Sequence, residues 1–172
     1  FAPLEAAARR AKLRLLSEVA GQPLGLDGHN VLITLECARR GLPLVAADDG
    51  FIRDTGQVSR GFKPSRDTDR VLALLLDYLV EQHWQEPVAV FYDAPMSLSG
   101  ELARRTYDAA AARGLKLTAA AVPVPEKDLQ DFPGPIATSD TALIDAHPLV
   151  VDLAGELIRR QGRPVITLSE GD

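Results

Sequence analysis

Aspartates recur in this sequence at one kind of position, just after a short apolar run that is typical of a buried strand. If these strands are parallel, their carboxyl ends share one edge of the sheet, which is where open α/β sheets bind ligands. The sequence therefore predicts a group of carboxylates at that edge. The runs 22–26, 42–47, 87–92 and 135–138 supply Asp27, Asp48 with Asp49, Asp93, and Asp140.

Carboxylates that are brought together repel one another, and in a low dielectric a cation is needed to offset that repulsion. Mg²⁺ and Mn²⁺ are hard ions that prefer oxygen ligands and keep part of their water shell. Such an ion can activate water and hold a scissile phosphate. The spacing therefore indicates metal-assisted hydrolysis of a phosphodiester bond.

A simpler interpretation applies to each aspartate taken alone. An Asp after a strand often serves only as the N-cap of the next helix. Four such positions at one edge favour a shared site over capping alone. Asn30 is likewise an N-cap candidate for the helix 31–40. Asp145, which follows Asp140 on the next helix, is open to two interpretations, a solvated position or a further oxygen ligand.

The elements that must position these side chains alternate along the chain. Several helical patterns end in Gly, which closes the last turn of a helix in the left-handed conformation, and an apolar run follows each of them. This alternation predicts an α/β fold, a three-layer Rossmann-like sandwich with a mostly parallel sheet. Further strands are expected at 115–122, 149–151 and 163–168, and helices at 4–19, 30–40, 67–83, 99–113 and 153–161.

The 172 residues are enough for one domain with a sizeable core. We expect an N-terminal helix in residues 1–20 and a single α/β domain in residues 21–172. Two stretches, 50–64 and 123–135, are expected to be long irregular loops. Loops of that length inside a compact domain often carry function.

From about residue 21 onward, the chain resembles the PIN-like domains, in particular their NYN branch. Asp27-Gly28-His29-Asn30 is similar to the Asp-x-x-Asn phrase after the first strand of that branch, and the phrase at 137–144 is similar to its later Ser-x-Asp phrase. The phrases at 48–54 and 93–97 add a closer resemblance to an uncharacterised prokaryotic family of PIN-like domains, which is known as a domain of unknown function.

The resemblance implies a Rossmann-like sheet and a nuclease that depends on Mg²⁺ or Mn²⁺, with RNA as its substrate and partner. Carried over to this sequence, the catalytic metal ligands would be Asp27, Asp93 and Asp140. Asp49 or Asp145 would assist them as further metal ligands.

The sequence departs from the NYN pattern in two places. The second Asp of the later phrase is replaced by Ala142, so Asp145 would have to substitute for it. The acidic helix that precedes this phrase is not evident, and Glu126-Lys127-Asp128 stands in its place on a predicted loop.

A nucleic-acid substrate needs hydrogen-bonding and positively charged groups near the carboxylates. Asn30 and Ser139 are expected to contact the substrate beside the metal. The alternative for the basic side chains is ordinary solvated surface. Those in or beside the first loop are Arg53, Arg60, Lys63 and Arg66, and Lys127 lies in the second; Arg53, Lys63 and Lys127 are the predicted phosphate ligands.

Composition narrows the class of protein. Hydrophobic residues make up 46% and charged residues 25%, as in globular domains, and no apolar run approaches the roughly 20 residues of a membrane span, so no membrane partner is expected. The net charge of -5 argues against a protein that coats nucleic acid by bulk charge.

The single cysteine, Cys37, is expected in the core and suits a reducing, cytoplasmic compartment. A homodimer is compatible with the sequence.

Other chemistries lack their motifs. There is no phosphate-binding glycine loop, no nucleophile elbow and no zinc spacing among the histidines. Three functions follow, in order of preference. The first is a metal-dependent ribonuclease, the second a non-catalytic nucleic-acid or protein interaction module of PIN-like fold, and the third a phosphoesterase that acts on small molecules.

Overall fold

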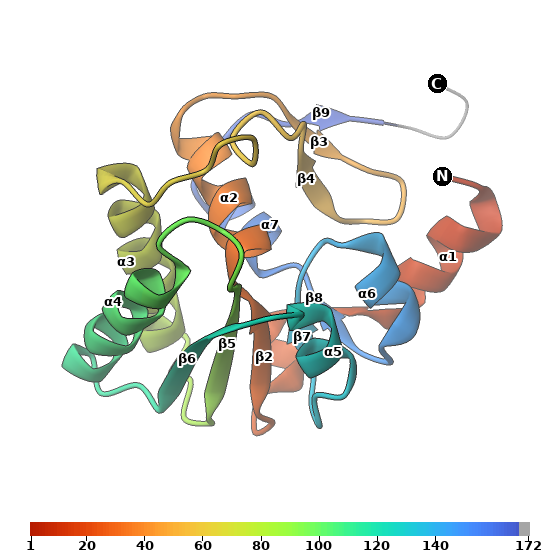
Figure 1. The fold of residues 1–172 in the computed structure, drawn as a ribbon. Coiled ribbons are helices and arrows are strands. Elements are labelled where there is room, and N and C mark those ends of the chain that lie inside the picture. The colour runs from red at the N-terminus through yellow and green to blue at the C-terminus, as the bar shows by residue number, and fades with distance from the viewer. Residues whose placement is uncertain (169–172) are drawn as a thin grey trace.

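A six-stranded sheet in which every neighbouring pair of strands is parallel forms the centre of the molecule (Figure 1). The computed structural model describes residues 1–168. The strand order is β1-β8-β7-β2-β5-β6, so β2 lies between β7 and β5. The predicted α/β class and parallel sheet are confirmed. The strands are β1 (Leu13–Arg14), β2 (Leu24–Asp27), β5 (Val88–Asp93), β6 (Leu117–Val122), β7 (Ile136–Ala137) and β8 (Val150–Val151).

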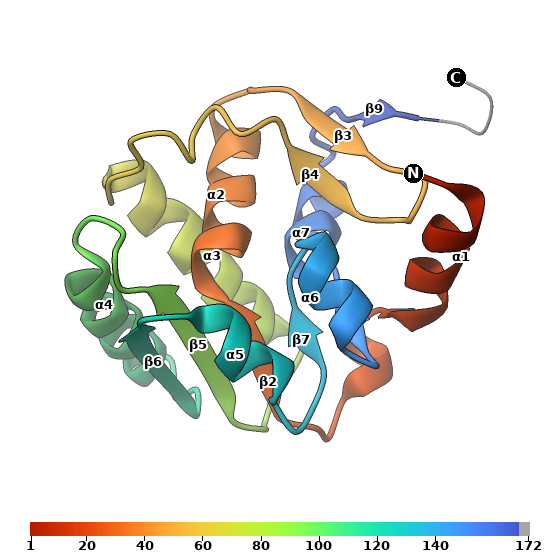
Figure 2. The same ribbon diagram turned by 45° about the vertical axis from the view of Figure 1, so that its right-hand side comes forward.

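Helices cover both faces of this sheet, which confirms the three-layer Rossmann-like sandwich (Figures 1 and 2). On one face α2 packs against β5, α3 and α7, while α4 packs on β5 and β6. On the other face α5 contacts β2 and β5, with α6 beside it. The helices are α1 (Pro3–Lys12), the short 3₁₀ helix η1 (Leu16–Val19), α2 (Gly28–Arg39), α3 (Arg66–Glu81), α4 (Ser99–Ala112), α5 (Pro125–Gln130), α6 (Thr141–Ala146) and α7 (Leu153–Arg160).

Strand register decides which face the aspartates occupy. In β5, alternate residues are buried on the side of α2 and α4, and the others face α5. Phe91 belongs to the second set, because its ring packs edge-on against Phe132, just after α5. Asp27 pairs with Phe91 across the β2–β5 ladder, so Asp27 and Asp93 share this face. Both carboxylates are therefore directed to the layer that contains α5.

Two of the predicted strands do not join the central sheet. A separate three-stranded sheet contains β3 (Leu44–Ala46), flanked by the antiparallel β4 (Ile52–Asp54) and the parallel β9 (Ile166–Thr167). The expectation that the run 42–47 ends at the same edge as the other strands is therefore wrong. The strands β3 and β9 satisfy each other's backbone groups, and this small sheet lies at the end of the molecule toward which β2 and β5 run (Figures 1 and 2).

Two boundary predictions are corrected. The expected N-terminal helix of residues 1–20 is only α1, which ends at Lys12 because Leu13 is extended and begins the edge strand β1. Neither long loop is wholly irregular, since the first contains β4 and the second contains α5. The expectation that Cys37 is buried in the core is confirmed.

Asp152 ties the two sheets together. It follows β8 directly, is 4% exposed, and caps α7 by accepting a hydrogen bond from the Gly155 N–H at 3.1 Å. Its other oxygen accepts the N–H of Ile52 in β4 at 2.9 Å. Burial raises the pKa of Asp152 to about 6, against the opposing effect of these two donors. One side chain therefore fixes both the start of α7 and the position of the small sheet.

This clamp predicts that Gly155→Ala destabilises the fold. An added methyl group would lie 2.0 Å from Asp152 Oδ2, an atom that is already held by Ile52. We expect a loss of about 1–3 kcal/mol in urea unfolding, because overpacking outweighs the better helix propensity of Ala. The matched control is Gly100→Ala in α4, where nothing lies within 4 Å. Equal stability of the two variants would contradict the clamp.

Candidate carboxylate site

Four acidic side chains from three strand ends and one helix gather at the carboxyl edge of the central sheet. Asp27 ends β2, Asp93 ends β5, and Asp140 follows β7 as the N-cap of α6. Glu126 comes from the first turn of α5, which covers β2 and β5. We call Asp27, Asp93, Glu126 and Asp140 the carboxylate cluster. The prediction that the aspartates after runs 22–26, 87–92 and 135–138 share one edge is confirmed by the parallel ladders.

Asp27 carries the strongest sign of this crowding. Burial raises the pKa of Asp27 to about 7, and the charges of Asp140, Glu126 and Asp93 add to the rise. The hydroxyl of Thr138 donates to Asp27 Oδ2 at 2.8 Å and offsets part of it. An ionised Asp27 is therefore costly in the absence of a compensating cation.

A hydrogen-bond set joins the start of α2 to the segment after β7. Asn30 Oδ1 accepts the backbone N–H of Ser139 at 2.9 Å and its hydroxyl at 3.2 Å. Thr138 Oγ1 in turn accepts the N–H of Asp140 at 3.1 Å. Asn30 is not the N-cap of α2, because that helix begins at Gly28. Asn30 and Ser139, both predicted substrate ligands, thus position the segment that carries Asp140.

His29 supports the end of β5 at the same edge of the sheet. The backbone N–H of Asp93 donates to His29 Nδ1 at 3.1 Å, so the ring carries its proton on Nε2. Burial lowers the pKa of His29 to about 4, so the ring is neutral. It packs edge-on against Tyr92 and Phe62, with ring centroids 5.1 Å and 5.6 Å away. His29 is therefore a positioning residue for the end of β5.

Asp49 and Asp145, the two predicted assisting ligands, belong to a different group. Asp49 is fully buried and accepts two hydrogen bonds from Arg53, at 2.8 Å and 2.7 Å. Burial opposes its ionisation, but Arg53 and Arg9 outweigh this and lower its pKa. Asp145 is bound by Arg9 at 2.9 Å and 3.2 Å, and this hydrogen bond lowers its pKa. Both carboxylates are already neutralised by arginine. They form a group separate from the carboxylate cluster and have no charge left for a metal ion.

The predicted phosphate ligands are placed differently from one another. Arg53 is engaged with Asp49, and its Nε donates to the carbonyl of Ser139 at 2.9 Å, so it braces the site from outside. Lys127 is exposed on α5, next to Glu126. Lys63 lines a shallow hollow of about 300 Å³ together with Phe62, Met96 and Ser97.

The carboxylate cluster suits a hard cation in charge and in donor type, yet its members are not drawn tightly together. Within residues 1–168 no three His, Cys, Asp or Glu side chains stand close enough to form a ready-made metal site. Mg²⁺ commonly keeps several waters and contacts only one or two carboxylates directly. Asp27 and one neighbouring carboxylate, with the others reached through water, would satisfy that requirement.

Sequence reasoning missed Glu126 as a site residue because the surrounding segment was interpreted as a loop. The signal was present, since Pro at the first helical position followed by acidic residues is typical of a helix start. It also missed Asp152, which directly follows β8, another strand of the central sheet. Asp152 is occupied by backbone donors and has a structural role.

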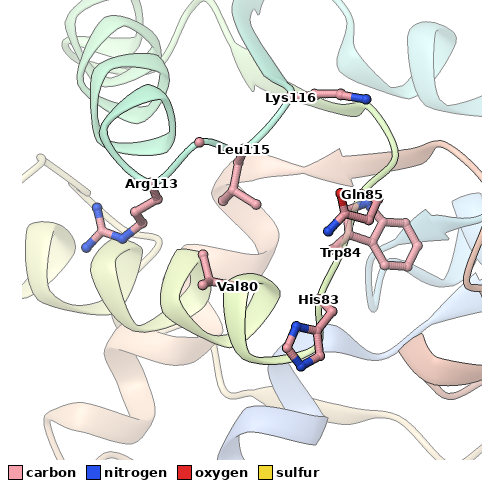
Figure 3. Close-up of a pocket in the computed structure, with 8 residues that line it drawn as sticks. Val80, His83, Trp84, Gln85, Arg113, Leu115 and Lys116 are labelled. Atoms are coloured by element: carbon pink, nitrogen blue, oxygen red, sulfur yellow. The ribbon is translucent and has the colours of Figure 1, made fainter.

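A separate cavity of about 210 Å³ lies at the opposite, amino edge of the sheet, between the ends of α3 and α4 (Figure 3). Val80 and Leu115 point toward each other there, and Arg113 and Lys116 supply positive charge. The residues that line it include no carboxylate. It therefore does not contribute to the carboxylate cluster.

Comparison with known proteins gives the family. The family model of a domain of unknown function, DUF5616, matches residues 16–156. The chain belongs to the DUF5616 family. The chain is similar to the uncharacterized protein MJ0935 of Methanocaldococcus jannaschii, 31% identical over 151 residues, which are 87% of this chain and 71% of that protein. No solved structure matches this DUF5616 chain.

The matched segment contains every member of the carboxylate cluster. It also contains Asn30, Thr138 and Ser139, which position the cluster, and it begins after α1. Of the helices described over residues 1–168, none has both the length and the apolar character of a membrane span.

The high pKa of Asp27 predicts how Asp27→Asn changes stability with pH. In the native protein Asp27 keeps its proton up to about pH 7, whereas the unfolded chain releases it near 3.8, so stability is lost as pH rises through this window. Asn cannot ionise, so its free energy of unfolding does not fall in this window. The stability of Asp27→Asn relative to the native protein should therefore rise by roughly 1–4 kcal/mol between about pH 4 and pH 8.

Urea unfolding in EDTA measures this difference, with the exposed Asp108→Asn as the control. A gap between Asp27→Asn and native protein that stays constant with pH would show that Asp27 is not perturbed.

Proposed function

We propose that this DUF5616 domain is a metal-dependent phosphodiesterase that hydrolyses RNA. The observation that carries the proposal is Asp27, a carboxyl group whose burial and acidic neighbours leave its charge uncompensated. Outside the cluster, Asp49 and Asp145 are bound by arginine, whereas Asp27 forms no ion pair with any residue between 1 and 168. The resemblance to PIN-like nucleases supports the same assignment.

Each residue of the site has a role in this proposal. Asp27 and Asp140 are the principal ligands for Mg²⁺ or Mn²⁺, with Asp93 and Glu126 as further acidic residues near them. The bound ion would supply a Lewis acid for a phosphoryl oxygen and lower the pKa of a water. Thr138 orients the Asp27 carboxylate through its 2.8 Å hydrogen bond. Asn30 holds the Ser139 segment in register, so that Asp140 stays beside Asp27.

One observation favours a second candidate, a non-catalytic interaction module of the same fold. The acidic side chains described over residues 1–168 do not converge as three or more around one point. An interaction module that kept the PIN-like fold but had lost its metal site would have acidic side chains spaced in this way. Calorimetric titration with Mn²⁺ distinguishes the two candidates, since the nuclease binds the ion and the module does not. The predicted cytoplasmic location and homodimer are part of the proposal and are not needed for the chemistry.

The test is cleavage of labelled single-stranded RNA in Mn²⁺, Mg²⁺ or EDTA by the native chain and by three variants. We expect metal-dependent cleavage that falls at least about 100-fold in Asp27→Asn and Asp140→Asn, because charge stabilisation of the reacting phosphate is lost. Glu126→Gln should show a smaller loss.

The control for this assay is Asp108→Asn on the exposed side of α4, which should keep full activity. Cleavage that persists in EDTA, or that survives both Asp27→Asn and Asp140→Asn, would refute the proposal.

A further inference from the structure

Four basic side chains follow one another in the segment that leads into α3 and along its first turns. Each is exposed, and none forms an ion pair with any residue between 1 and 168. We call them the basic segment: Arg60, Lys63, Arg66 and Arg70.

The acidic residues of the same stretch do not cancel this charge. Asp67 binds Arg39 of α2 at 3.0 Å, and Asp69 binds Arg105 of α4. Each acid in the first turn of α3 is thus neutralised by an arginine from another helix. The four charges of the basic segment are left uncompensated in a chain whose net charge is -5.

The basic segment passes beside the turn that follows Asp93 at the end of β5. Lys63 shares its hollow with Met96 and Ser97, which follow Asp93 by three and four positions. Phe62, the residue before Lys63, packs on His29, and His29 accepts the N–H of Asp93. The segment therefore runs from the end of β5 onto the outer surface of α3.

An acidic site repels a polyanion, so a strand that reaches it must gain its binding energy from cations nearby. We propose that the basic segment is a docking surface for the phosphate backbone of single-stranded nucleic acid, which it leads toward Asp93. A row of separate cations suits a flexible strand whose phosphates are evenly spaced. The approach to the cluster rests on the proposed function, whereas binding to the segment does not.

The test is fluorescence anisotropy with a labelled single-stranded RNA oligonucleotide in EDTA, where no cleavage occurs, over a range of salt concentrations. Losing one phosphate contact reduces the salt slope by about 0.7 and weakens binding about fivefold at 0.1 M salt. We expect this for Lys63→Gln, and about 25-fold for Arg66→Gln with Arg70→Gln. The matched control is Lys116→Gln, an exposed lysine at the opposite edge (Figure 3), which should bind as the native chain does.

The outcomes separate this inference from the proposed nuclease. Native RNA binding that drops in Lys63→Gln but not in Lys116→Gln supports the docking surface, even if no cleavage is ever detected. Equal losses in the two lysine variants, or no RNA binding by the native chain, would overturn it. Competition by heparin as strong as that by unlabelled RNA of matched charge would overturn the assignment to nucleic acid.

Discussion

The candidate site depends on one buried carboxyl group, that of Asp27, whose ionisation is opposed by burial and by three acidic neighbours. β2 is an interior strand, so its last residue is enclosed by β5 on one side and β7 on the other. The same topology brings three further carboxylates toward Asp27. Proteins normally avoid such a group of carboxylates or pair it with basic side chains. Here no basic side chain between residues 1 and 168 forms an ion pair with a member of the cluster. Thr138 contributes one hydrogen bond, which orients the carboxylate without supplying positive charge.

Positive charge is available close by but is held elsewhere. Arg53 contacts the residue next to Asp140, since its Nε donates to the carbonyl of Ser139. Its guanidinium is nevertheless bound to Asp49, and Arg9 is bound to Asp49 and Asp145. Arg53 of the small sheet and Arg9 of α1 are therefore already paired, with Asp49 between β3 and β4 and with Asp145 of α6. This separation leaves the carboxylate cluster without an arginine partner, so Arg9 and Arg53 would not compete with a cation bound there.

The site also depends on strands that are too short to be rigid by themselves. β7 and β8 have two residues each, so their ladders supply few hydrogen bonds. Side chains compensate for this. Asn30 holds the segment after β7, Asp152 holds the segment after β8, and His29 holds the end of β5. Polar residues at strand ends thus provide the hydrogen bonds that longer ladders would otherwise supply.

The sequence alone determined that Asp27, Asp93 and Asp140 share an edge, because buried apolar runs separated by helices form parallel strands whose ends coincide. It could not determine the role of Asp49 or of Glu126. The run before Asp49 looks like any other buried strand, but it pairs with β4 and with β9, a partner more than a hundred residues away, instead of joining the central sheet. Glu126 lies on a helix of six residues, too short to show a periodic pattern. Strand pairing and helix docking depend on contacts between residues far apart in the sequence. Only the tertiary structure therefore decided that Asp49 pairs with arginine and that the charge of Glu126 acts on Asp27.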